Sequence, residues 1–157
     1  MTTAIGTKLV GNVIAGEEQG ARSGATFEKL APATGTALSA VARSGREDAD
    51  AAIAAAVEAQ PDWAARPVPE RGVVLRRIAQ LLERDRDDVA AVVAAETGKS
   101  PRDARGETDA AIEMGYFVAG EGRRFYGRTT TSGVPNRQAL TVRQPLGVAG
   151  LIIAANT

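Results

Sequence analysis

The spacing of apolar positions changes along the chain from short alternating runs to a helical repeat. Three short runs rich in strand-forming residues come first, at Lys8 to Ala15, Ala25 to Leu30 and Thr36 to Ala42. The last two are separated by Pro32-Ala33-Thr34-Gly35, which predicts a turn because proline fixes φ and glycine tolerates a positive φ. We therefore expect residues 1–43 to form a small antiparallel unit, a β-hairpin arm.

Apolar residues then recur every three to four positions, which predicts helices. Ser44 and Glu47 have the spacing of a capping box and mark the expected start of the first helix. Pro61 is expected to end this helix, because proline disrupts a helix interior. The second helix is expected to open after Pro67 and Pro69, where proline fits the first turn.

Two further helices are expected before Gly127. Asp85 to Asp88 mark a break and a new helix start, and Gly98 has the residue type preferred just past a helix end. Ser100-Pro101 then supplies an N-cap followed by proline at the first helical position. Residues 44–127 are thus expected to form a four-helix segment.

The last part of the chain returns to extended patterns. Thr129 to Gly133 is interpreted as a polar loop, Ala139 to Arg143 as an alternating strand, and Pro145-Leu146-Gly147 as a turn. Val148 to Ala154 is a continuous apolar run, typical of a strand buried on both faces of a parallel sheet. The predicted fold class is α/β. Two segments complete the division: 128–146, a strand and linker, and 147–157, the first strand of a doubly wound sheet.

Composition narrows the function classes. The 157 residues carry 19 basic and 19 acidic side chains, so the net charge is zero, and no basic field favours nucleic acid or an anionic membrane. The longest apolar run, Gly147 to Ala155, is too short to cross a bilayer, and the first residues make a poor signal peptide. We therefore expect a cytoplasmic protein. The absence of Cys and His excludes thiolate and histidine catalysis, as well as the commonest metal ligands.

Two glycine motifs suggest nucleotide binding, but their contexts favour structure. Gly98-Lys99-Ser100 resembles the end of a phosphate-binding loop, yet Val93 stands where that loop needs glycine and a helix precedes it. Gly120-Glu121-Gly122 lacks the third glycine at dinucleotide-fingerprint spacing, and it ends a helix. We interpret the first motif as a helix C-cap and N-cap, and the second as small residues where helices pack closely.

Polar candidates for chemistry are few. The acidic residues of the third and fourth helices are interpreted as solvated or paired in local salt bridges: Glu96, Glu107, Asp109 and Glu113. Asn156 differs, because it follows a buried-type strand at the end where a ligand crevice opens. Its neutral amide could donate to a developing oxyanion, and the alternative is a plain turn residue.

Four segments resemble motifs of the aldehyde dehydrogenase family, in the family's order and at its spacings. Pro145 to Asn156 resembles P-x-G-V-x-x-x-I-x-P-W-N, and Glu96 to Ser100 resembles E-x-G-K-P. Pro32 to Gly35 is similar to the turn N-P-A-T-G, and Tyr116 to Gly120 to the stretch Y-x-A-G. The resemblance covers residues 8–157 and implies the N-terminal portion of the family's fold, in which the cofactor domain is Rossmann-like. It also implies that Ala139 to Arg143 is an oligomerisation strand.

The resemblance further implies an active-site role for the end of the chain. Asn156 matches the oxyanion-hole position, where an amide stabilises the thiohemiacetal formed by a Cys. Four residues match positions beside an NAD or NADP cofactor: Ile152, Ile153, Ala154 and Ala155. The substrate would be a small aldehyde, oxidised to a carboxylic acid by a homo-oligomer, either a dimer or a tetramer. The sequence departs from the family where Ala154-Ala155 replaces Pro-Trp.

The family's Cys, general-base Glu and phosphate-binding helix have no counterparts here, so we expect this chain to be inactive alone, as the N-terminal part of a longer enzyme. One alternative is a non-catalytic interaction module that pairs with a full-length homologue. A self-sufficient carboxylate or Lys enzyme is a weaker alternative. An unpaired apolar strand at Val148 to Ala154 would also make the isolated chain poorly soluble.

Overall fold

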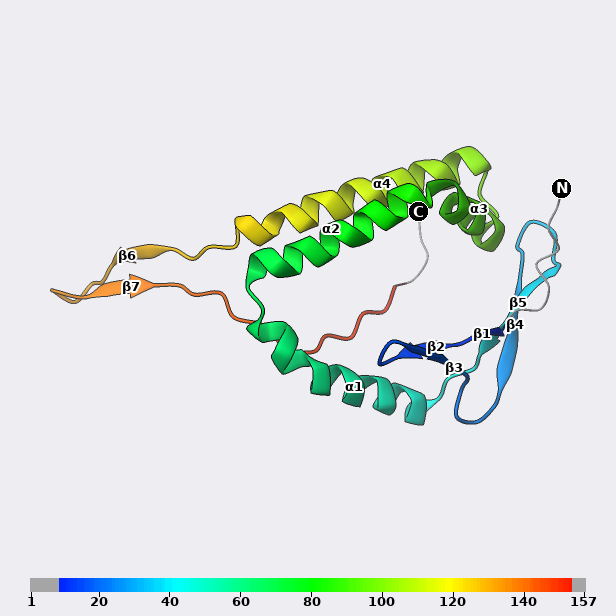
Figure 1. Ribbon diagram of the computed structural model, residues 1–157, viewed down its shortest axis with the longest axis horizontal. Helices are drawn as coiled ribbons and strands as arrows, with labels where there is room; N and C mark the ends of the chain where they lie inside the picture. The colour runs from blue at the N-terminus through cyan, green and yellow to red at the C-terminus, as the bar shows by residue number, and fades with distance from the viewer. Residues whose placement is uncertain (1–8, 154–157) are drawn as a thin grey trace.

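The structure, a computed structural model, describes residues 9–153 of the chain. Figure 1 shows small β-sheets at one end, a long antiparallel helix pair in the middle, and a β-hairpin projecting from the other end. A further helix, α1, diverges from the central pair, and the last described residues run between α1 and this pair. The class is mixed α/β, as predicted.

The N-terminal unit contains five strands: β1 Leu9–Val10, β2 Asn12–Ile14, β3 Glu17–Gln19, β4 Thr26–Leu30 and β5 Ala37–Ala42. Strand β5 lies between β4, which is antiparallel to it, and β1, which is parallel. The expectation of a wholly antiparallel unit is therefore wrong for β1. The single strand predicted over Lys8 to Ala15 is divided, because β2 leaves the sheet to pair with β3.

Local backbone geometry explains the two turns of this unit. Ala15 and Gly16 both have positive φ, 53° and 84°, which matches the tight two-residue turn that joins β2 to β3. The predicted turn at Pro32 to Gly35 is confirmed. Gly35 has a φ of 71° and donates its N–H to the carbonyl of Ala31 at 2.8 Å.

Four α-helices follow, as predicted: α1 Arg46–Ala65, α2 Val68–Arg84, α3 Arg86–Thr97 and α4 Pro101–Gly120, extended by a short 3-10 turn, Glu121–Arg123. Asp85 separates α2 from α3, in agreement with the predicted acidic break. The sequence pattern thus located the four α-helices. The differences lie in how α1 begins and ends, and in the last helix, which was expected to continue to about Phe125 and ends at Gly120.

The first helix is capped by residues other than those predicted. Gly45 is the N-cap, and the carboxylate of Asp48 accepts its backbone N–H at 2.8 Å. The second carboxylate oxygen accepts the N–H of Arg22 at 2.8 Å, so Asp48 also ties the helix to the β unit. Ser44, expected at the cap, instead donates its hydroxyl to the side-chain oxygen of Asn12 at 2.6 Å.

Pro61 does not end α1, contrary to prediction. The helix continues through it to Ala65 and ends at Arg66, whose ψ is 137°. Arg66 precedes Pro67, and the residue before a proline is disfavoured in the helical region. The effective stop signal is therefore Pro67.

The central pair, α2 and α4, packs closely because glycines face each other. A Cβ atom on Gly72 would lie 2.8 Å from the carbonyl oxygen of Ala119, and one on Gly122 would lie 3.0 Å from the carbonyl oxygen of Val68. The interpretation of Gly122 as a close-packing residue is confirmed. The buried hydrophobic residues of the described chain are mostly alanines, spread over the β unit and the helices, and Ile112 is the largest fully buried side chain, at 2% exposure.

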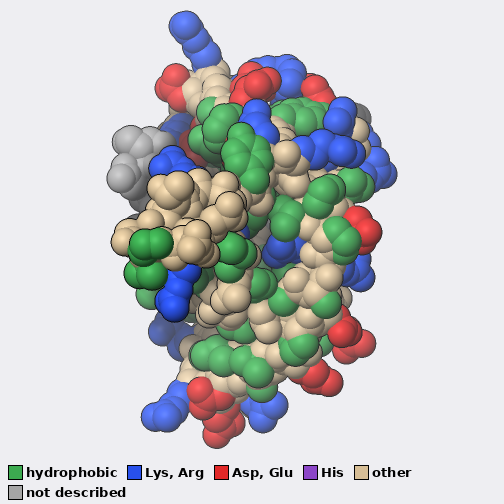
Figure 2. Space-filling view, turned by 90° about the vertical axis from the view of Figure 1, so that its left-hand side faces the viewer, with side chains coloured by type: hydrophobic (Ala, Val, Ile, Leu, Met, Phe, Trp, Pro, Cys, Tyr) green, Lys and Arg blue, Asp and Glu red, His purple; other side chains and the backbone are tan. Residues whose placement is uncertain are grey.

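The projecting hairpin pairs β6, Thr129–Thr131, with β7, Gln138–Leu140, in antiparallel register. The predicted loop at Thr129 to Gly133 is therefore partly a strand, and the predicted strand at Ala139 to Arg143 ends earlier. Figure 2, which looks from the side of this hairpin, shows hydrophobic side chains exposed among charged ones.

The strand predicted over Val148 to Ala154 is not formed in its described part, 148–153. A strand buried on both faces needs neighbours to bond with, and no strand of residues 9–153 lies beside it. Leu151, Ile152 and Ile153 are consequently exposed, Leu151 at 84% and Ile153 at 87%. The prediction of a buried strand is therefore wrong for residues 148–153 of this chain.

Candidate functional site

The predicted site residues lie at the end of a segment we call the tail, residues 141–153. Ile152 and Ile153 are in its last described part and are almost fully solvent-exposed. Ala154, Ala155 and Asn156 lie outside the described residues. The described elements nearest to this site are those that carry the tail.

A contact at the root of the β6–β7 hairpin, here called the clasp, fixes where the tail begins. The N–H of Arg128 donates to the hydroxyl oxygen of Thr141 at 2.9 Å, and the N–H of Thr141 donates to the carbonyl of Arg128 at 2.8 Å. Gly127 permits this approach, because a Cβ atom there would overlap with the carbonyl oxygen of Thr141. Beyond the clasp, the guanidinium of Arg143 lies 5.2 Å from the ring centroid of Phe125, a cation–π contact.

Beyond Arg143 the tail borders a cleft that the helices also line. This tail cleft has a volume of about 560 Å³, and its walls include Trp63, Val68, Arg71, Leu75, Phe125 and Leu146. Gly147 lies at its edge with a φ of 101°, a conformation that glycine accepts readily. The predicted turn at Pro145 to Gly147 is not formed as a hydrogen-bonded turn. The cleft is mostly apolar, and its charged and polar lining residues are Arg71, Glu121, Arg143 and Gln144.

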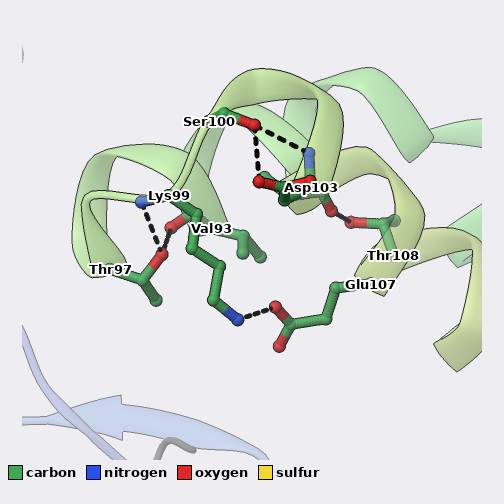
Figure 3. Close-up of polar contacts among 8 residues, drawn as sticks. Val93, Thr97, Lys99, Ser100, Asp103, Glu107 and Thr108 are labelled. Carbon is green, nitrogen blue, oxygen red and sulfur yellow. Dashed lines mark hydrogen bonds and ion pairs between the residues drawn. The ribbon is translucent and has the colours of Figure 1, made fainter. Parts of the chain in front are cut away.

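The second family-like motif, Glu96 to Ser100, forms the corner between α3 and α4 (Figure 3). Gly98 has a φ of 76° and ends α3, and the Ser100 hydroxyl accepts the N–H of Asp103 at 3.1 Å to begin α4. Lys99 forms an ion pair with Glu107. The interpretation of Gly98-Lys99-Ser100 as two helix caps is confirmed, since its hydrogen bonds are those of helix ends and its ammonium group is already paired.

This corner rests on the predicted turn of the β unit. A Cβ atom on Gly98 would lie 3.4 Å from Pro32 and 3.6 Å from the backbone nitrogen of Ala33. The ammonium of Lys29 also lies 3.9 Å from the carboxylate of Glu96. Two motifs more than sixty residues apart in sequence therefore meet, and their contact joins the β unit to the helices.

The acidic candidates are mostly engaged in salt bridges. Besides Glu107 and Glu96, Asp109 lies 2.9 Å from the guanidinium of Arg86. The salt-bridge interpretation is confirmed for these three. No group of carboxylates suited to a metal ion occurs among residues 9–153, and none of the helices described there is long and apolar enough to cross a membrane.

One polar contact had no signal in the sequence. The hydroxyl of Tyr116 donates to the carboxylate of Glu83 at 2.5 Å, joining α4 to α2. This hydrogen bond, together with burial and the negative charge of Glu83, raises the pKa of Tyr116 above its ordinary value. The residues are 33 positions apart, so only the packing of the helix pair brings them together.

Comparison with known proteins decides what these motifs belong to. The profile of the aldehyde dehydrogenase family matches residues 19–157, which include all four resembling segments. The chain belongs to the aldehyde dehydrogenase family. The resemblance inferred from the motifs is thereby confirmed.

Curated aldehyde dehydrogenases with similar sequences carry the names of semialdehyde dehydrogenases. Malonate-semialdehyde dehydrogenase 1 from Geobacillus thermodenitrificans is 38% identical over 156 residues, which cover 99% of this chain and 32% of that protein. Succinate-semialdehyde dehydrogenase [NADP(+)] from Escherichia coli is 33% identical over 92% of this chain and 30% of that protein. The chain thus spans about a third of the length of these relatives.

Solved aldehyde dehydrogenase structures share the fold over the same portion. Succinate-semialdehyde dehydrogenase from Burkholderia pseudomallei superposes with a TM-score of 0.82 at 36% identity, over 85% of this chain and 28% of that one. A 3,6-anhydro-L-galactose dehydrogenase in complex with NAP superposes with a TM-score of 0.77 at 28% identity, over 83% of this chain and 28% of that one. The predicted fold class, the N-terminal part of an aldehyde dehydrogenase, is confirmed.

Proposed function

We propose that this chain forms the N-terminal third of an NAD(P)-dependent aldehyde dehydrogenase and does not oxidise aldehydes by itself. The observation that supports this most is the family match over residues 19–157, set against the coverage of only 32% of a 38% identical relative. The sequence contains no cysteine, so the covalent nucleophile of the family chemistry must come from outside these 157 residues.

In this proposal Asn156 supplies one donor for the oxyanion. Its side-chain amide donates an N–H to the aldehyde oxygen as negative charge develops there, and it stays uncharged at any working pH. One wall of the cofactor site is formed by four residues: Ile152, Ile153, Ala154 and Ala155. The cofactor, NAD or NADP, would accept the hydride when bound. The exposed apolar side chains of Ile152 and Ile153 fit such a wall, because a flat aromatic ring system buries apolar surface against them.

The substrate class we propose is a small semialdehyde, because the relatives compared above are named for malonate and succinate semialdehydes. Which carbon chain length is preferred, and whether NAD or NADP is used, depends on residues beyond this third of the fold. A panel of semialdehydes and plain aldehydes, each with both cofactors, measures this directly.

The projecting β6–β7 hairpin supports a role in self-association. Each described residue of β6 and β7 is exposed, and the hairpin extends away from the helices (Figure 1). We propose that it pairs with a second copy in the complete enzyme, giving a dimer or tetramer. The molar mass of the complete enzyme with and without residues 129–140 tests this, and an unchanged mass would argue against the hairpin.

A chimera tests the catalytic proposal. Residues 1–157 replace the matching N-terminal segment of the Geobacillus thermodenitrificans malonate-semialdehyde dehydrogenase, and NAD(P)H formation is followed spectroscopically. We expect an active chimera, no activity from residues 1–157 alone, and a loss of about 10²–10³ in kcat for Asn156→Ala, the usual cost of one oxyanion donor.

The matched control is Gln80→Ala. Gln80 is an exposed amide side chain on α2 that does not line the tail cleft, so its removal deletes an amide away from the proposed site and from the hairpin. Its kcat should equal that of the unchanged chimera. Equal kcat values for Asn156→Ala and Gln80→Ala, or an inactive chimera that is correctly folded by circular dichroism, would refute the proposed role of this chain.

A further inference from the structure

A second pocket, here called the helix-pair pocket, lies between α2 and α4 on the face that does not border the tail cleft. The α2 residues that line it, Pro69, Val73 and Arg76, recur at helical spacing and so share one face of that helix. Of its lining residues, Gly72 and Gly122 alone also line the tail cleft, at the close approach of the two helices. The pocket has a volume of about 220 Å³, below the roughly 300–1,000 Å³ of pockets for drug-sized ligands, so it suits a small molecule.

Two arginines line opposite ends of the helix-pair pocket. Arg123 belongs to the end at Pro69, because a Cβ atom on its neighbour Gly122 would lie 3.4 Å from the Cα atom of Pro69. Arg76 belongs to the other end, since it follows Pro69 by roughly two turns of α2, about 10 Å of helix. Gly72 lines the stretch between these ends and contributes no side chain to fill it. The pocket is therefore an open groove with a guanidinium group at each end.

The charge of this groove is positive and uncompensated within the described chain. Neither Arg76 nor Arg123 forms an ion pair with a carboxylate of residues 9–153. None of the described residues that line the groove is acidic. The carboxylates whose charge acts on Tyr116, a wall residue, are Glu83 and Glu113, and neither of them lines the groove; Glu83 also accepts the Tyr116 hydroxyl. A small ligand that fits this groove therefore carries negative charge.

We propose that the helix-pair pocket binds a short dicarboxylate, with one carboxylate on the guanidinium of Arg76 and the other on that of Arg123. A planar guanidinium donates two parallel N–H groups to one carboxylate, so each end recognises one such group. The separation of the two ends favours a ligand with two anionic groups over a single ion such as phosphate. The biological meaning rests on the proposed function, because oxidation of the aldehyde group of a semialdehyde yields a dicarboxylate. The product would thus also bind at a pocket that shares no residue with the tail.

Isothermal titration calorimetry of the folded chimera described above measures this binding. The probes are malonate and succinate, whose semialdehydes appear in the names of the relatives. Acetate and inorganic phosphate, at matched ionic strength, are the control ligands. We expect at least one dicarboxylate to bind saturably and about tenfold or more tightly than either control ligand, since it alone engages both guanidinium groups. Equal binding of dicarboxylates and phosphate would show an unselective anion site and overturn the assignment.

Substitutions at the two ends identify the contacts. Arg76→Met and Arg123→Met each remove one guanidinium from an exposed position, and we expect each to weaken dicarboxylate binding about tenfold or more. Arg76→Lys keeps the charge without the planar fork and should retain part of the affinity, which guards against a folding defect of the first variant. Arg77→Met on the same helix α2 is the matched control, because Arg77 is exposed and does not line the groove, and it should leave the affinity unchanged.

The same variants separate this pocket from the active site and from the proposed function. Dicarboxylate bound only at the active site would compete with the aldehyde and would not depend on either arginine, so affinity that survives both Arg76→Met and Arg123→Met overturns the proposal. If the chimera is active but binds no dicarboxylate through these arginines, the pocket proposal fails while the proposed function stands. If a folded chimera is inactive yet binds dicarboxylate through both arginines, the proposed function fails and the pocket stands.

Discussion

Single side chains decide how the units of this protein are joined. Asp48 is the clearest case, because its two carboxylate oxygens accept backbone N–H groups from Gly45 at the start of α1 and from Arg22 in the preceding loop. The sequence pattern predicted a capping box of Ser44 and Glu47, whose side chains could cap a helix as well as Asp48 does. The choice of Asp48 depends on the distant partner Arg22, and a local motif contains no information about it.

The Asp48 carboxylate should make stability depend on pH. The hydrogen bonds from Gly45 and Arg22 hold its pKa below the ordinary value of 3.8. A carboxyl group with a depressed native pKa stabilises the fold fully above its unfolded pKa and loses that contribution as the pH falls through the native value. The melting temperature of the chimera should therefore drop below pH 3.8 more steeply in the unchanged protein than in Asp48→Asn.

At pH 7 Asp48→Asn itself should melt at a lower temperature, because an amide has only one acceptor oxygen for two N–H groups. Asp50→Asn, an exposed neighbour on the same helix, is the control and should melt as the unchanged protein does. Thermal melts followed by circular dichroism at pH 7 and pH 3 measure both effects. Identical pH profiles for the two variants would contradict the capping role.

At the scale of elements, helices were predictable and strands only partly so. The caps at Gly98 and Ser100 were identified from sequence because all their partners lie within four residues. The pairing of β1 with β5 joins residues about thirty positions apart, and its parallel direction follows from the path of the chain between them. The helix end predicted at Pro61 is wrong, because a proline lowers the stability of a helix without necessarily ending it, and α1 continues to Ala65.

The glycines between α2 and α4 give a test at this scale. Gly72→Ala would place a Cβ atom 2.8 Å from the carbonyl oxygen of Ala119, so the helices must separate, and we expect a loss of about 1–3 kcal/mol in the free energy of unfolding. Gly106→Ala in α4 is the control. Nothing lies within 4 Å of its added Cβ, and it should stabilise by up to about 1 kcal/mol.

Urea denaturation of the chimera measures both glycine variants. If Gly72→Ala and Gly106→Ala shift the midpoint in the same direction, the helices are not held at the distance described. If they shift in opposite directions, the spacing of the helix pair is set by the small residues, and the same spacing positions Tyr116 to bond with Glu83.

At the scale of the whole molecule, the described part is an incompletely buried piece of a larger fold. Ile112 is its one large side chain that is fully buried within residues 9–153, and many large apolar residues are exposed on α1, α2 and the tail. Exposed apolar area of this extent marks interaction surfaces or a risk of aggregation. The apolar run at Val148 to Ala154 indicated from sequence that apolar surface would be left without partners. The candidate site residue Asn156 was predicted from sequence alone, and it lies outside the described residues.

The isolated chain should consequently be poorly soluble and bind a hydrophobic dye. Replacing Leu151 and Ile153 by Ser should lower dye fluorescence and light scattering of residues 1–157, because these are among its most exposed apolar side chains. Replacing Ala139 and Gln138 by Ser, in the exposed strand β7, is the control. A monomeric chain with a sharp two-state melt and no dye binding would contradict this prediction.

The clasp at Gly127 and Thr141 has a practical consequence for the design of variants. The hydrogen bonds between Arg128 and Thr141 join the two ends of the β6–β7 hairpin. The position of the tail after residue 141 therefore does not depend on the length of the hairpin. An epitope, a fluorophore or a shortened connection could be exchanged at the tip without disturbing the path to Asn156. A change of Gly127 to any larger residue would instead shift that path at its origin.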